Sequence, residues 1–339
     1  MNPNEIKTVN SLLDVMEDGR EFESLLKYRF QVDFVKEIRK SIDEIKNTRH
    51  HPVICYVANV IKGGNKASID NSDDLPFTEM VNSVDVDIKE IDVVIVTNGG
   101  LAEQVNSFVN TLRPRFNRVN FIVLNAAMSA GTIFIMSGDE IVMSKQSKFG
   151  PIDPQIPNKE GVLIPAQSIL IAIKDIQKRG EEKLKNHQQP DWSDIQLLKN
   201  IDAKDIGRAL SASNHSTEMV KEFLCKYKFN SWERHSSNNQ PVSDKEKEER
   251  AEEIAKLLCD HSVWKSHGHT INRDAAWNEC KLKITHAEDI EGLERAMRRM
   301  WALFYWLFEN TQMVKIFVSE NYCIIRNAPI MNPLIPVKR

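Results

Sequence analysis

The feature that most restricts the fold is a run of almost entirely β-branched residues, Ile91 to Thr97. A run this apolar is typical of a strand in the middle of a parallel sheet, where both faces are covered. It ends at Asn98-Gly99-Gly100. An amphipathic helix is predicted over residues 101–113, and a second apolar strand over 119–124. The order strand–helix–strand predicts an α/β fold with a parallel sheet.

Further elements extend this pattern in both directions. Strands are predicted at 53–57 and 139–144, helices at 75–90 and 165–185, and a hairpin over 314–326. We therefore expect three parts. A helical arm spans residues 1–50, a central domain spans residues 51–285, and an extension made of a helix and a β-hairpin spans residues 286–339.

Composition excludes several classes of protein. The chain has 339 residues, 41% hydrophobic residues and a net charge of -3, which fits a globular protein and gives no basis for a nucleic-acid partner. Its 5 cysteines form no CxxC pair, so neither a zinc knuckle nor a disulfide framework is expected. We expect no metal and no cofactor. We find no signal peptide and no apolar run of about 20 residues, so a cytoplasmic protein without a membrane span is expected.

The candidate nucleophile is Ser129. It lies in the stretch from Leu124 to Gly138, among small residues, where a strand gives way to a helix. The first turn of a helix offers free N–H groups, which stabilise developing negative charge. The alternative is that this serine only caps the helix, a position in which serine is common.

A second segment converges on this serine. Gly99-Gly100 and Ser129 both follow successive parallel strands, and the carboxyl ends of such strands carry the sites of α/β sheets. The N–H groups of Gly100 and Ala130 could together hold an oxyanion, with Gly99 as a further candidate. The alternative for the two glycines is a tight turn without a function.

These residues resemble a known family, the serine dehydrogenase proteinases, which are relatives of signal peptide peptidase A and the Clp-type proteases within the crotonase-like superfamily. The matching segments include Ile91-Asp-Val-Val-Ile-Val-Thr-Asn-Gly-Gly100, Ala127-Met-Ser-Ala-Gly-Thr132, Gly150-Pro-Ile-Asp-Pro-Gln155 and Trp264-Lys-Ser-His267. The resemblance covers roughly residues 50–285. It implies a crotonase-like fold of stacked β-β-α turns, a Ser129 nucleophile and peptide-bond hydrolysis without a metal.

The general base is less clearly marked. Clp-type relatives have a histidine about 25 residues after the serine, and this chain has none there, so a Ser-Lys dyad is the better fit. Lys174 lies beside the apolar stripe of the 165–185 helix, and burial would lower its pKa enough for a base. Lys178 is a further candidate, and His267 is either a base brought in by folding or a residue that only holds a loop. Asp153 either orients a base or caps a turn between two prolines.

The sequence thus favours a metal-independent serine endopeptidase that acts on a protein or peptide substrate as a homo-oligomer. Two alternatives stay open. One is a crotonase-type enzyme acting on an acyl thioester, and the other is a binding or scaffold protein that keeps the fold without the chemistry.

Overall fold

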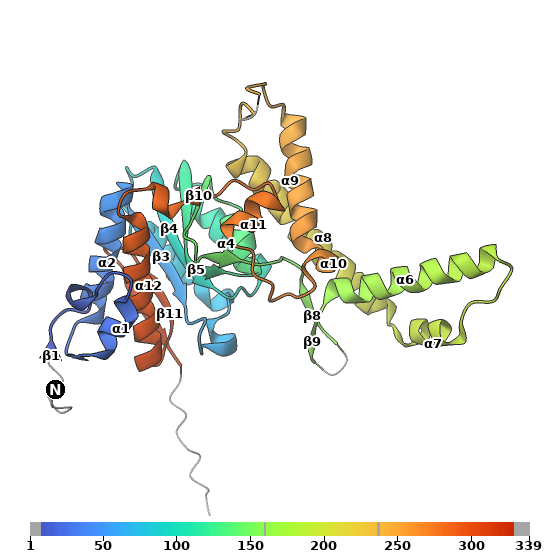
Figure 1. Cartoon of the computed structure of the whole chain (residues 1–339), viewed down its shortest axis with the longest axis horizontal. Helices are drawn as coiled ribbons and strands as arrows, with labels where there is room; N and C mark the ends of the chain where they lie inside the picture. Colours follow the sequence, from blue (N-terminus) through green and yellow to red (C-terminus); the bar gives the residue numbers. More distant parts are fainter. Residues whose placement is uncertain (1–7, 159–160, 236–237, 329–339) are drawn as a thin grey trace, which may run out of the picture.

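The computed structural model describes residues 8–158, 161–235 and 238–328. Its centre is an eight-stranded sheet in the order β10-β6-β5-β4-β3-β11-β12, with β7 pairing with β5 (Figure 1). Strands β3 to β6 run parallel, and β11 pairs antiparallel with β3 and with β12. The strands are β3 (Val53–Ala58), β4 (Glu90–Thr97), β5 (Arg118–Ala127), β6 (Glu140–Met143), β7 (Lys148–Phe149), β10 (Thr285–His286), β11 (Met313–Val318) and β12 (Cys323–Asn327).

Strand β4 shows why the sheet must be covered on both faces. Ile91, Val93 and Ile95 belong to one hydrophobic core, whereas Val94 and Val96 belong to the other. Side chains alternate between the faces of a strand, so a continuous apolar run needs an apolar layer on each side. The predicted α/β fold with a parallel sheet is confirmed.

Helices cover the two faces of the sheet. One core takes residues from three helices, α1 (Glu21–Leu26), α2 (Phe34–Arg49) and α12 (Leu293–Asn310). The other core takes residues from α3 (Asp74–Asn82), α4 (Ala102–Leu112), α5 (Ala130–Ile135), α8 (Ala203–Phe223), α9 (Asp244–Cys259) and α11 (Arg273–Asn278). A π-helical turn, Leu224–Lys228, follows α8.

An arm extends from the side of this body. It consists of α6 (Ala166–Lys185), α7 (Trp192–Asn200) and the first part of α8, and it projects away from the sheet in Figure 1. A small hairpin, β8 (Gln155–Pro157) with β9 (Leu163–Pro165), lies at its base. The short helix α10 (His261–Trp264) follows α9.

Some predicted elements differ from the observed ones. The helix predicted over 75–90 ends at Asn82, because a turn follows in which Asp85 Oδ1 accepts a hydrogen bond from the N–H of Asp87 at 3.0 Å. The predicted helical arm over 1–50 holds only α1, α2, a 3-10 turn (Leu13–Val15) and two short strands, β1 (Thr8–Val9) and β2 (Arg29–Phe30). Its residues 1–7 lie outside the described residues.

The C-terminal hairpin is confirmed as β11 and β12. Both outer parts of the chain pack on the central sheet, since α2 and α12 share one core with β3, β4 and β5. The boundaries of the three predicted parts stay a prediction. Among the described residues, no helix combines the length and the apolar character that crossing a bilayer requires.

Candidate active site

Ser129 lies at the turn between β5 and α5, in a strained backbone conformation. Its φ is 52° and its ψ is -118°. A non-glycine residue at positive φ is uncommon outside the compact left-handed region, and such strain gathers at functional sites. Its hydroxyl makes no capping hydrogen bond to the helix, and the residue is half-buried. Ser129 is thus the N-cap residue of α5 by position, but its side chain does not cap the helix as the alternative from the sequence would have it.

The glycine turn lies directly against this serine, as the parallel-strand argument predicts. Gly99 has φ +96°, and a Cβ placed on it would stand 2.7 Å from the Cβ of Ser129 and 3.0 Å from the N of Ala130. No side chain fits there, and positive φ also favours glycine. The two segments are neighbours in space.

The glycine turn is held from its other side by Ile69. The N–H of Ile69 donates to the carbonyl oxygen of Gly99 at 2.8 Å, and the N–H of Leu101 donates to the carbonyl oxygen of Ile69 at 2.9 Å. In the described part of the chain, the N–H groups of Gly100 and Ala130 donate to no acceptor. They are the pair of donors that the sequence suggested for an oxyanion.

A buried carboxylate holds two histidines beside this region. The side chain of Asp153 is fully buried, and its Oδ1 lies 2.7 Å from Nδ1 of His267. Its Oδ2 lies 3.1 Å from Nδ1 of His261. A carboxylate accepts, so Nδ1 of His267 carries the proton and Nε2 is left as the basic nitrogen. Asp153 thus does more than cap a turn.

Two tertiary contacts tie the segments that carry this cluster to β7 and to α5, the helix that begins after Ser129. Phe149 in β7 exchanges two backbone hydrogen bonds with Ile271, at 3.0 and 2.8 Å. These bonds fix the loop that follows α10 and carries His267, called the histidine loop below, beside β7. The hydroxyl of Thr132 in α5 donates to the carbonyl oxygen of Ala127 or of Gly150, at 2.8 and 2.9 Å. The start of α5, the loop of Asp153 and the loop of His267 therefore form one unit.

A cavity of about 560 Å³ opens at the carboxyl edge of the sheet. It is lined by Met128, which precedes Ser129, by Asn98, which precedes the glycine turn, and by His267. Met128 and Asn98 adjoin Ser129 and the glycine turn in sequence, so the cavity lies next to both segments, although His267 is the one candidate site residue in its lining.

The lysines predicted as bases lie elsewhere. Lys174 and Lys178 are both exposed on α6, which belongs to the projecting arm (Figure 1). We predicted that the apolar stripe of this helix would bury Lys174, and that prediction is wrong. Only Ala166 and Ile176 of α6 are buried, because the helix packs along one narrow contact with α8. An exposed lysine keeps its hydration and lacks the desolvation that a lysine base needs.

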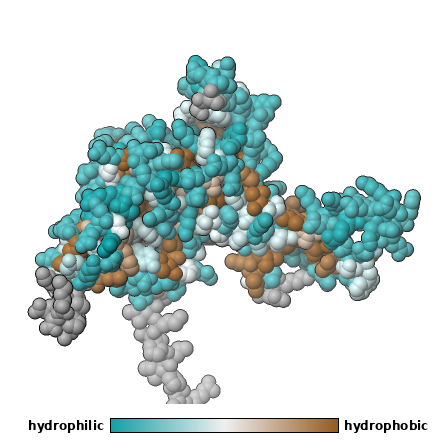
Figure 2. Space-filling view, in the orientation of Figure 1, coloured by the Kyte–Doolittle hydropathy of each residue, from teal (hydrophilic) through white to brown (hydrophobic). Residues whose placement is uncertain are grey.

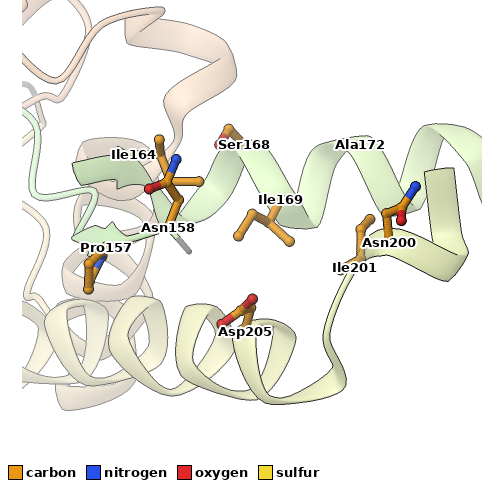
Figure 3. A pocket seen from close by; sticks show the side chains of 9 residues that line it. All are labelled: Pro157, Asn158, Ile164, Ser168, Ile169, Ala172, Asn200, Ile201 and Asp205. Atoms are coloured by element: carbon orange, nitrogen blue, oxygen red, sulfur yellow. The ribbon is translucent and has the colours of Figure 1, made fainter. Parts of the chain in front are cut away.

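A second cavity, of about 280 Å³, lies within the arm. Figure 3 shows it between α6, which contributes Ser168, Ile169 and Ala172, and the turn from α7 into α8, where Ile201 and Asp205 lie. Its lining includes none of the candidate catalytic residues, so it is separate from the serine site.

Neither metal ligands nor a reactive thiol compete with the serine here. Within residues 8–158, 161–235 and 238–328, no group of three histidine, cysteine or acidic side chains has metal-binding geometry. Burial raises the pKa of the Cys259 thiol, which lies next to the histidine loop, and so keeps the nucleophilic thiolate scarce.

Ser129 at the strand-to-helix turn, the paired glycines and the carboxylate–histidine pair are the kinds of groups that a serine hydrolase site would need. Residues 67–207 match the family described as ClpP-like SDH-type serine proteinase. The family resemblance inferred from the sequence is thereby confirmed for this segment, which is similar to ClpP-like serine proteinases and makes up less than half of the chain. The match includes Ser129, both glycines, Asp153 and both arm lysines, but it ends before His267.

Two curated relatives match shorter stretches. Both are uncharacterized proteins of Methanocaldococcus jannaschii. One is 33% identical over 95 residues, which is 28% of this chain and 30% of that protein. The other is 38% identical over 82 residues, which is 24% of this chain and 26% of that protein. The matches thus span less than a third of these relatives.

Two solved structures are similar to the chain in parts. Both are of the 1510-N membrane-bound stomatin-specific protease, one a serine-to-alanine mutant and one a lysine-to-alanine mutant in complex with a substrate peptide. The first has 13% identity and a TM-score of 0.39, and it covers 68% of this chain and 79% of that one. The second has 14% identity and a TM-score of 0.40, and it covers 81% of this chain and 88% of that one.

Proposed function

We propose that the chain is a serine peptidase in which Ser129 is the nucleophile, His267 the general base and Asp153 the residue that orients it. The Gly100 and Ala130 N–H groups form the oxyanion hole. The general base thus differs from the lysine that the sequence favoured. The observation that carries the proposal is the 2.7 Å contact between His267 Nδ1 and the fully buried Asp153.

Three features support these roles. The buried carboxylate fixes the tautomer and the orientation of the imidazole, which is the function of the aspartate in a serine–histidine–aspartate triad. Met128 and His267 line one cavity, so a substrate bound there reaches both the turn of Ser129 and the histidine loop. The strained backbone of Ser129 presents its hydroxyl without a capping bond.

The reaction follows from these roles. The Ser129 Oγ attacks the peptide carbonyl carbon while its proton passes to Nε2 of His267, and the carbonyl oxygen becomes an oxyanion that accepts from the two N–H groups. The C–N bond then breaks, and the imidazolium returns the proton to the leaving amine. Water attacks the acyl-enzyme with His267 again as the base, which releases the carboxylic acid and restores the serine.

Cleavage of an unstructured protein substrate, followed by mass spectrometry, tests the proposal. We expect wild type to cut and Ser129→Ala to lose at least about a thousandfold in turnover, whereas Ser211→Ala, on an exposed position of α8, stays at the wild-type rate. His267→Ala should match the loss of Ser129→Ala, and His261→Ala should lose far less. A metal chelator should leave turnover unchanged.

Other outcomes would contradict the peptidase. Wild-type protein that cuts nothing would favour the scaffold alternative. Turnover of acyl thioesters that survives Ser129→Ala would favour the thioester alternative. The cytoplasmic location stays a prediction of the sequence.

We also propose that the chain forms a homo-oligomer through the arm. Large apolar side chains are exposed along it, among them Trp192 (75% exposed), Leu163 (62%) and Leu184 (62%). Figure 2 shows apolar residues gathered where the β8–β9 hairpin meets the arm. Patches of this kind mark contacts with other chains. Light scattering should show an oligomer in wild type and a smaller species for Trp192→Ser combined with Leu163→Ser. A monomeric wild type would contradict this.

A further inference from the structure

The cavity beside the proposed nucleophile has an unusual electrostatic character. Its lining contains one lysine, Lys148, and one histidine, His267, but no aspartate or glutamate. The whole chain has a net charge of -3, so this absence of acidic residues is local to the cavity. A wall with a positive group and no carboxylate favours an anionic ligand.

The position of Lys148 is fixed by strand pairing. It lies in β7, and its Cα is the partner of Ala126 in β5, three residues before Ser129. The side chain is half-buried, and within the described residues it has neither an ion-pair nor a hydrogen-bond partner. Other lysines do have acidic partners, for example Lys221, which contacts Glu248 and Glu252 at 2.9 and 3.0 Å. The positive charge of Lys148 is thus available to a bound molecule.

A second wall of the cavity is aromatic and apolar. Trp301 and Tyr305 come from α12, with ring centroids 5.8 Å apart in an edge-to-face arrangement. Phe22 packs against Tyr305 at 4.8 Å and supports the wall from behind. Val60 and Ile61, which follow β3, complete an apolar surface. Rigid aromatic surfaces of this kind bind large apolar side chains at little cost in conformational entropy.

We propose that this cavity is a substrate subsite for a peptide segment that combines an acidic side chain with a large apolar neighbour. The carboxylate contacts Lys148, and the apolar side chain packs on Trp301 and Tyr305. The proposal rests on the proposed peptidase function, because it treats the cavity beside Ser129 as the place where the peptide lies. Ala126 and Met128 line the cavity, so the residues it selects lie next to the scissile bond.

The cavity is large enough to hold more than one residue of a bound peptide. A cavity of about 560 Å³ exceeds what one side chain fills, and an extended peptide advances about 3.3 Å per residue. The aromatic wall belongs to α12, which lies outside the segment that matches the proteinase family. The selectivity we infer is therefore a feature that this chain adds through its C-terminal region.

Peptide binding on the Ser129→Ala background tests the subsite without turnover. Peptides share one sequence with a large apolar residue and carry Glu, Gln or Lys at the neighbouring position. We expect the Glu peptide to bind about tenfold more tightly than the Gln peptide, as a charge-assisted contact of this kind allows. Adding Lys148→Glu should reverse the order in favour of Lys, and Lys148→Arg should keep the Glu preference.

Matched variants separate the two walls. Lys145→Glu makes the same change of charge at an exposed position three residues away, and it should leave the preference intact. Trp301→Ala should weaken binding of all peptides that carry the large apolar residue while the Glu preference persists. Both results would support the division of the cavity into a cationic and an apolar wall.

The outcomes distinguish the subsite from the peptidase. Equal binding of the Glu, Gln and Lys peptides, or a Glu preference that survives Lys148→Glu, would overturn the subsite whether or not wild type cuts them. Loss of neutral-peptide cleavage in Lys148→Gln would also overturn it, because the lysine would then serve the chemistry. Selective, reversible binding together with a wild type that never cuts would support the subsite as a binding site and contradict the peptidase alone.

Discussion

The segment over residues 261–271, which is α10 and the loop after it, and helix α6 both carry basic side chains, but the two regions surround them differently. In the loop, His267 contacts a fully buried carboxylate at 2.7 Å, and the loop is hydrogen-bonded to β7 beside the serine turn. In α6, Lys174 and Lys178 are exposed on a projecting arm. Whether a basic side chain is suited to act as a general base thus depends on the groups packed around it. It does not depend on whether a helix or a loop carries that side chain.

The largest effect should come from Asp153→Asn, which keeps the volume of the side chain and removes its charge. The amide no longer enforces the tautomer in which Nε2 of His267 is basic, so we expect turnover to fall by about 10³- to 10⁴-fold. Steady-state cleavage of a peptide measures this. An activity within tenfold of wild type, in a folded variant, would show that the loop does not supply the base.

The next effect concerns how the C-terminal hairpin holds the glycine turn. Lys315 in β11 is buried and contacts both carboxylate oxygens of Asp73 at 2.8 Å. Asp73 follows Ile69 closely in sequence, and Ile69 pairs with Gly99 and Gly100. Lys315→Met leaves a buried carboxylate with less compensation, so the free energy of unfolding should fall by about 3–5 kcal/mol.

Denaturant unfolding measures the change in the free energy of unfolding caused by Lys315→Met. A second variant, in which an exposed lysine is replaced, controls for the general effect of losing a lysine side chain. Lys46 pairs with Glu320 at the surface, where both side chains are well exposed. Lys46→Ala should cost no more than about 1 kcal/mol. Equal effects of the two substitutions would show that the buried pair does not hold the turn.

A smaller effect separates two glycines, one beside Ser129 and one in α6. Gly99→Ala places a methyl group against Ser129 and Ala130 at positive φ, which should displace the oxyanion donors and reduce turnover by about a hundredfold. Gly180 in α6 has open space around it, and Gly180→Ala should raise the free energy of unfolding by about 0.5–1 kcal/mol with turnover unchanged. Activity assays and thermal unfolding of both variants check the contrast. A larger loss of activity in Gly180→Ala would reverse our assignment of the two regions.

The sequence predicted those features that depend on local periodicity and on strand order. The apolar runs at 91–97 and 119–124 gave strands β4 and β5 to within a few residues, and parallel pairing brought Gly99 to Ser129. These follow from continuous apolar runs, which are typical of strands buried on both faces, and from the rule that parallel strands end at one edge.

The general base could not be predicted in the same way. Asp153 and His267 are 114 residues apart and meet through irregular loops, which leave no periodic signal. The burial of Lys174 depended on what packs against α6, and one apolar stripe did not reveal that the helix belongs to a thin arm. The Trp264-Lys-Ser-His267 segment was the available signal, because it belongs to the resemblance inferred from the sequence, although the family match itself ends at residue 207.

The most direct test of the central claim is the rate of labelling by a fluorophosphonate probe in His267→Ala and in Lys174→Ala, with circular dichroism confirming that both are folded. Our account predicts that His267→Ala labels at least about a hundredfold more slowly than wild type, and that Lys174→Ala labels at the wild-type rate. Loss of labelling in Lys174→Ala with normal labelling in His267→Ala would contradict it and return the base to the arm.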